Sequence, residues 1–171
     1  MNVLRAETSS AGTHIPDVRG TSFSNEAVNL PEALKGKVGV LVLGFSRSSG
    51  DANTRWGKRL AADYRESPTV VYYEMPVLEA VPRMMRGVVV RSIKSSVPAS
   101  EQARFVPILE NEAAWKTVCH YGQPDDSYVL VVDGQGNVAW QTQGEATDAA
   151  YAALKEHVEA LRSHIAMASA K

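Results

Sequence analysis

The chain contains a single cysteine, Cys119, which is the first residue to consider for redox chemistry. A thiol reacts as its thiolate, so a reactive cysteine needs surroundings that lower its pKa. His120 follows directly, but successive residues of a helix point about 100° apart, so adjacency in the sequence does not make the two a pair. Cys119 also ends a short predicted helix, where the negative dipole raises a thiol pKa. We therefore interpret Cys119 as a buried or half-buried structural thiol.

A second candidate is the polar loop over residues 46–51, which separates an apolar run from an amphipathic segment. Its first residues precede a predicted helix N-terminus, where free N–H groups favour negative charge. They are Ser46, Arg47, Ser48, Ser49 and Gly50. This composition is suited to a small anion such as phosphate or a carboxylate. Alternatively, the serines only satisfy the end of the helix.

A catalytic serine at Ser49 is disfavoured, because its hydroxyl would need an adjacent base. All the histidines are distant from this loop in the sequence: His14, His120, His157 and His164. The cysteine and histidines do not have the spacing of zinc ligands. We therefore expect neither a metal nor a cofactor.

A third candidate is a basic amphipathic segment over residues 77–97, which we predict to be a long helical insert. Its apolar stripe consists of Val81, Met84, Met85, Val88, Val89, Ile93 and Val97. The cations interleaved with this stripe are Arg83, Arg86, Arg91 and Lys94. Such a helix docks on a partner or on a membrane surface. The alternative is a helix of the domain with a solvated charged face.

Length and composition indicate one globular domain, with 171 residues of which 44% are hydrophobic. The 18 basic residues are balanced by 19 acidic ones, so general binding to nucleic acid is not expected. No run approaches the ~20 apolar residues of a membrane-spanning helix. Residues 1–10 lack the apolar core of a signal peptide. We expect a soluble protein, cytoplasmic as written, or exported or organellar with a targeting segment removed.

The first half of the chain predicts a parallel βαβ unit. Residues 38–45 form the continuous apolar run that is typical of a strand buried on both faces. Residues 53–65 have the apolar face of a helix, for which Asp51 or Asn53 is the predicted N-cap. Residues 69–75 are rich in β-branched and aromatic side chains and predict the second strand.

The second half predicts a hairpin followed by a helix. Residues 105–109 are expected to be extended at a sheet edge, because they contain Pro107. Two further strands over residues 128–132 and 137–142 flank a glycine turn. A helix follows over residues 146–166. We expect a flexible N-terminal segment over residues 1–22 and one domain over residues 23–166.

The order of these elements resembles the thioredoxin-like fold over residues 14–165. The stretches His14–Val18 and Leu34–Val38 are similar to the N-terminal part of peroxiredoxin-type and periplasmic thioredoxin-type domains. Val131–Val138 is similar to their final hairpin, and the segment from Trp140 to Leu154 resembles their closing helix. The resemblance implies an α/β, three-layer sandwich with a central mixed sheet, a C-terminal β-hairpin and a closing helix.

The resemblance also implies where redox chemistry would take place. Redox-active members carry two cysteines after the first buried strand, where this chain has Ser49, Gly50, Asp51 and Ala52. Their cis-proline, which faces the active site, corresponds to a position close to Ser127, and Pro124 comes three residues too early. The loop Ser46–Ala52 is thus expected to be a vestigial active-site loop.

Four further features narrow the resemblance: Trp56, the insert over residues 77–97, the Tyr128–Asp133 strand and Gly144. With these features, the chain is most similar, among thioredoxin-like families without the two cysteines, to the mitochondrial ATP-synthase assembly factors and their bacterial relatives. It implies a redox-inactive, non-enzymatic protein that helps a membrane complex assemble, as an assembly factor or chaperone, through protein contacts made by the insert. The alternative is a peroxiredoxin-like or thiol–disulfide oxidoreductase-like enzyme that uses Cys119.

Overall fold

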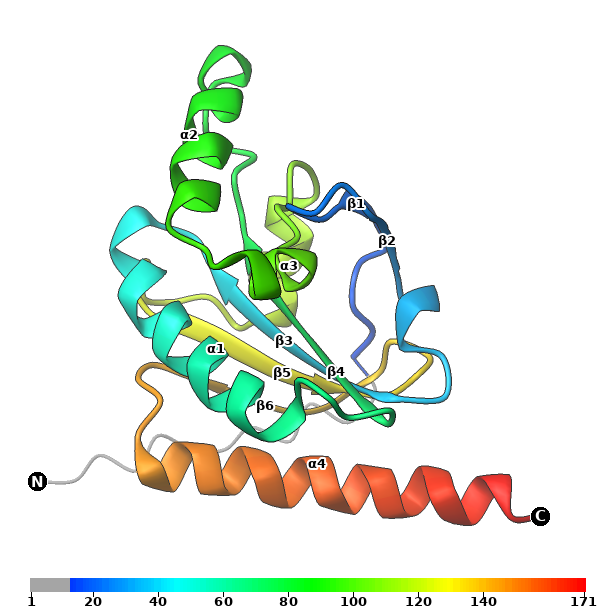
Figure 1. The fold of residues 1–171 in the computed structure, drawn as a ribbon. Helices are drawn as coiled ribbons and strands as arrows, with labels where there is room; N and C mark the ends of the chain where they lie inside the picture. The colour runs from blue at the N-terminus through cyan, green and yellow to red at the C-terminus, as the bar shows by residue number, and fades with distance from the viewer. Residues whose placement is uncertain (1–12) are drawn as a thin grey trace, which may run out of the picture.

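A four-stranded mixed sheet lies at the centre of the computed structural model, which describes residues 13–171 (Figure 1). Its strands are β3 (Val38–Gly44), β4 (Val70–Pro76), β5 (Ser127–Val132) and β6 (Val138–Gln143), in the order β4-β3-β5-β6. Strand β3 pairs in parallel with β4 and antiparallel with β5. All residues of β3 and β5 are buried, which explains why these strands are continuous apolar runs rather than alternating ones.

Two helices cover one face of the sheet, α1 (Gly50–Tyr64) and α4 (Asp148–Ser169) (Figure 1). The even-numbered residues of β3 face them and pack against Trp56, Leu60 and Leu154, all of which are fully buried. The indole Nε1 of Trp56 donates a 2.9 Å hydrogen bond to the carbonyl of Gly144, which fixes the loop before α4. Burial of these large side chains is the main force that holds the helices on the sheet.

A β-hairpin and a short helix cover the other face. The hairpin consists of β1 (Val18–Thr21) and β2 (Ala27–Leu30), and the helix is α3 (Glu112–Val118). The odd-numbered residues of β3 pack into this layer, against Trp115 among others. Single-turn 3₁₀ helices occur at η1 (Glu32–Leu34) and η2 (Arg47–Ser49), and a longer one forms η3 (Ala99–Arg104). The fold is therefore the predicted three-layer α/β sandwich.

Helix α2 (Arg83–Ser95) is the exception to this packing, because none of its residues is buried. It projects from the end of the molecule, beyond the carboxyl ends of β3 and β4 (Figure 1). The predicted helical insert over residues 77–97 is thus shorter than expected. Residues 78–82 are non-helical, and Pro82 directly precedes the first helical turn.

Two other predictions need correction. The segment predicted to be flexible, residues 1–22, lies partly outside the described residues, but residues 13–22 are packed: Ile15 is buried, and Val18–Thr21 form β1. The hydrophobic residues of this segment complete the layer below β3, which composition alone did not reveal. The predicted N-caps Asp51 and Asn53 lie inside α1, which begins at Gly50 as a continuation of η2.

Candidate functional site

The register of the sheet brings the end of β3 next to the start of β5. Gly44, the last residue of β3, pairs with Ser127, the first residue of β5. The polar loop follows β3 immediately and leads into α1, whose first turns lie above Gly44. The loop and Ser127 are therefore adjacent in space although they are far apart in the sequence.

Three polar side chains meet above Gly44, and we call Ser49, Asn53 and Ser127 the loop cluster. The hydroxyl of Ser127 donates a short hydrogen bond to the Asn53 side-chain oxygen. A Cβ atom at Gly44 would collide with the Asn53 amide and with the Ser49 hydroxyl, so glycine is required for this approach. Ser49 is 1% exposed and Ser127 is 0% exposed. The two serines are thus internal, Asn53 is partly buried, and the hydroxyls of both serines are engaged by the protein.

The loop itself is closed by a second set of hydrogen bonds. The Ser46 hydroxyl accepts from the backbone N–H of Ser49 at 3.2 Å and donates to the Asp125 carboxylate at 2.7 Å. The Ser49 hydroxyl donates to the carbonyl of Ser46 at 2.7 Å. The hydroxyls of Ser46 and Ser49 are therefore engaged within the protein, with a carboxylate beside Ser46, whereas Arg47 and Ser48 are exposed.

Ser49 also lacks the neighbours of a nucleophile. Its hydroxyl is committed as a donor to a carbonyl, and within residues 13–171 no histidine or carboxylate accepts its proton. Acyl or phosphoryl transfer through Ser49 would need such a base. The hydrogen bonds of the loop cluster are thus structural and do not prepare Ser49 as a nucleophile.

The structure brings together several of the predicted site residues and adds others. Ser127 lies beside the loop, because it pairs with Gly44. Asn53 and Asp125 complete the arrangement as partners of this loop that were not recognised from the sequence. Asn53 follows Ser49 by four residues, so its position on the same side of a helix was the available signal.

Cys119 lies in the opposite layer of the sandwich. It follows α3 and packs in the core cluster that contains Trp115 and Val118, on the face of the sheet away from α1. The side chain is 4% exposed, and burial raises the pKa of the thiol to about 12. Cys119 is thus a buried thiol with very little thiolate at neutral pH.

A buried carboxyl group under α1 was not recognised from the sequence. Glu74, in β4, is 5% exposed and points at Gly57 of α1, where a Cβ atom would approach its oxygen Oε1 to 2.6 Å. Burial, with a smaller contribution from the charge of Glu101, raises the pKa of Glu74 to about 8. Glu101 is bound by Arg65 at 2.6 Å and by the Tyr72 hydroxyl at 2.8 Å. A glutamate inside the apolar run of β4 was the signal for this group.

The predicted docking residues lie on α2, the least buried helix. This helix carries Arg83, Arg86, Arg91 and Lys94 and has no acidic residue. Met84 is 94% exposed, and Met85 and Val88 are exposed on the same helix. Arg86 is anchored to the preceding loop by bonds to the carbonyls of Glu79 and Val81. A protruding helix with a uniform charge and exposed apolar side chains is typical of an interaction surface.

Two further properties limit the chemistry of the described residues. Among residues 13–171, no group of three or more histidine, cysteine or acidic side chains is placed to hold a metal ion. In the same part of the chain, every helix is too short or too polar to span a bilayer.

Comparison with known proteins gives one family match. The model of the family described as "ATP10 protein" matches residues 5–161. No protein among the curated sequences matches the chain at a significant level.

Solved structures with this fold include thiol–disulfide enzymes and an assembly protein. A "putative Thiol:disulfide interchange protein DsbE" from Chlorobium tepidum is 16% identical, with a TM-score of 0.64 over 89% of this chain and 97% of that one. BsSco, "a member of the Sco family of cytochrome c oxidase assembly proteins", is 13% identical, with a TM-score of 0.61 over 95% and 99%. The exposed lipoprotein thioredoxin Etrx1 of Streptococcus pneumoniae is 11% identical, with a TM-score of 0.59 over 84% and 99%. At these identities the likeness establishes the thioredoxin-like fold and nothing further.

Proposed function

This chain belongs to the ATP10 protein family, and we propose that it is an assembly factor for ATP synthase that acts by binding a protein partner and not by thiol chemistry. The observation that carries this proposal is that the chain has a thioredoxin-like fold but only one cysteine. Thiol–disulfide exchange needs two cysteines or one exposed thiolate. The single thiol, Cys119, is buried in the other layer.

The location of the exposed apolar side chains supports a binding role. Within the described residues, Met84, Met85 and Val88 of α2 are exposed, whereas the apolar residues of α1 are largely buried. Exposed apolar groups on a protruding helix contribute little to folding but are available to a partner. We propose that α2 is the docking helix and that its four cations meet an acidic surface on an ATP synthase subunit. The family also connects this role with the mitochondrion, where we propose that the protein works.

The direct test is a pull-down of ATP synthase subunits with the tagged protein. Charge reversal at Arg83, Arg91 and Lys94 should weaken capture at least tenfold, because opposite charges across an interface then become like charges. Arg86 is left unchanged in this variant, since it anchors the preceding loop.

A matched control reverses Lys35, Lys37 and Lys58, which are exposed and form no ion pair within the described residues. This control changes the net charge equally and should retain capture. Equal loss in both variants would show a general charge effect, and capture unaffected by the α2 variant would exclude α2 as the docking helix. Failure to capture any ATP synthase subunit with the unaltered protein would contradict the proposed function itself.

A further inference from the structure

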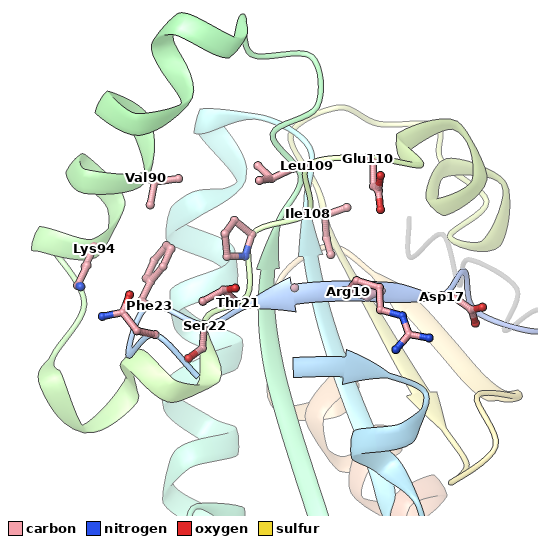
Figure 2. Close-up of a pocket in the computed structure, with 14 residues that line it drawn as sticks. Asp17, Arg19, Thr21, Ser22, Phe23, Val90, Lys94, Ile108, Leu109 and Glu110 are labelled. Atoms are coloured by element: carbon pink, nitrogen blue, oxygen red, sulfur yellow. The ribbon is translucent and has the colours of Figure 1, made fainter. Parts of the chain in front are cut away.

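A groove beside α2 is bounded by two extended segments that do not pair with each other. It has a volume of about 510 Å³ and is lined by β1, by residues 107–110 and by the inner side of α2 (Figure 2). Val90 and Lys94 of α2 face it, and Leu109 is exposed in its wall. The backbone N–H and C=O groups that are left unpaired along its two sides indicate which kind of ligand the groove can bind.

Strand β1 turns unpaired backbone groups toward the groove. In an antiparallel pair, successive residues point their N–H and C=O groups alternately toward and away from the partner strand. The N–H of Ser22 donates to Glu26 across the hairpin, so the even-numbered residues of β1 face β2. The N–H of Phe23 donates to Phe105 on the other side at 2.9 Å. Arg19 and Thr21 therefore present their backbone groups to the groove.

The opposite wall of the groove, residues 107–110, also presents unpaired backbone groups. The N–H of Ile108 donates to the carbonyl of Pro76, and its carbonyl accepts from Leu78, so Ile108 is paired with the segment that extends β4. The neighbouring residue Leu109 points the other way, and within the described part of the chain its N–H has no hydrogen-bond partner. The two walls are thus two open strand edges that face one another.

The charges along the groove are polarised. Lys94 lies at the α2 end, whereas Asp17 and Glu110 lie toward the other end (Figure 2). Arg19 also lines the groove, at the Asp17 end, and its guanidinium lies 3.9 Å from Glu32. The other cations of α2 add to the positive potential near Lys94, because the helix contains no acidic residue.

We propose that this groove binds an extended segment of the partner polypeptide, which adds as a strand to the edge of β1, with an acidic side chain at the α2 end and apolar side chains against Val90 and Leu109. An open strand edge recognises main chain, and its pockets and charges select the sequence. The four residues of β1 span about 13 Å at the rise of an extended chain, which sets the length of the paired segment. This inference rests on the proposed function for the identity of the partner, but the strand edge itself does not depend on it.

The experiment selects peptides from a random-sequence library displayed on phage and follows the best binder by amide hydrogen exchange. The amides of Arg19 and Thr21 should exchange rapidly in the free protein and slow at least tenfold when the peptide is bound. The amides of Val18 and Gly20 are the internal control, because they are already bonded to β2 and should change little. The selected peptides should carry an acidic residue, and Lys94→Glu should weaken their binding.

Two variants of Thr21 distinguish the contribution of its backbone N–H to peptide binding from that of its side chain. Thr21→Pro removes the outward N–H without removing a bond to β2, and it should weaken peptide binding at least tenfold. Thr21→Ala removes only the side chain and should bind within about twofold of the unaltered protein. The melting temperature of each variant checks that it is folded, and Lys94→Glu gives a second test if Thr21→Pro unfolds the hairpin.

Several results would overturn the groove proposal. They are the absence of any selected binder, equal protection of even-numbered and odd-numbered amides, binding that is indifferent to both Thr21→Pro and Lys94→Glu, or protection of Thr21 by self-association at high concentration. Peptide binding in the groove without capture of an ATP synthase subunit would support the groove and contradict the proposed function. Capture of a subunit that is unaffected by Thr21→Pro and Lys94→Glu would support the proposed function and contradict the groove proposal.

Discussion

Polar groups of the loop cluster are hydrogen-bonded within the protein, whereas polar groups at the groove beside α2 are left unpaired. At the start of α1, Ser49 and Ser127 are buried and Asn53 is partly buried, and their side chains are bound to one another or to the loop. Beside α2, backbone groups of Arg19 and Thr21 remain directed at an open groove. Unpaired polar groups are retained where water or a partner can satisfy them, and they are removed from sites that exclude both. The difference agrees with our proposal that the protein acts by binding a partner at α2 and the groove, and not by chemistry at the loop cluster.

A reactive thiol outside the loop cluster would contradict this contrast, because the protein could then act by thiol chemistry as well as by binding. Because burial raises the pKa of Cys119 from 9.0 to about 12, the thiolate fraction at neutral pH should be about a thousandfold lower than for an unperturbed cysteine. Labelling with a thiol-specific disulfide reagent at pH 8 should be correspondingly slow in the folded protein and fast in urea.

The control for this measurement is the double variant Cys119→Ser with Ser48→Cys, which moves the thiol to an exposed loop position. Rapid labelling of native Cys119, or consumption of peroxide that disappears in Cys119→Ser, would restore the enzymatic alternative.

The pH dependence of stability tests whether the buried polar groups under α1 act structurally. The pKa of Glu74 is raised from 4.5 to about 8, so the folded state keeps the carboxyl protonated while the unfolded chain ionises. The stability that Glu74 contributes should be fully present below pH 4.5, decline as the pH rises toward 8, and be lost above that value. At about 1.4 kcal/mol for each unit of pKa difference, the total loss is of the order of a few kcal/mol.

Denaturant titrations from pH 4.5 to pH 8.5 measure this slope. Glu74→Gln should flatten it, whereas Glu66→Gln, at an exposed position on the turn after α1, should leave it unchanged. The same slope in Glu74→Gln and in the unaltered protein would show that Glu74 is not the responsible group.

Two glycine-to-alanine variants test the tight packing of the loop cluster. Gly44→Ala forces a Cβ atom into the Asn53 and Ser49 side chains and should lower the free energy of unfolding by about 1–3 kcal/mol. Gly50→Ala has open space around its Cβ and lies at the start of α1, so it should be neutral or stabilise by up to about 1 kcal/mol. Urea denaturation of the two variants gives both values, and equal stabilities would contradict the close packing above Gly44.

Much of the fold could be predicted because its signals are local. The apolar run of β3, the glycine turn between β5 and β6 and the apolar face of α4 each depend on a spacing within a few residues of one another. The boundaries of α2 and the N-terminus of α1 were less accurate. Ser46 caps the 3₁₀ turn η2, which runs directly into α1, so the capping residue lies before the predicted Asp51 or Asn53.

The sequence by itself determined the order of elements, the absence of a cysteine pair and the clustering of four cations on one short helix. Only the tertiary structure decided that Ser127 and Asn53 meet above Gly44, that Glu74 is enclosed under Gly57, and that β1 leaves one edge open. Helical and strand periodicities relate residues that are close in the chain, whereas these contacts join segments that only the register of β3 with β5 and the docking of α1 bring together.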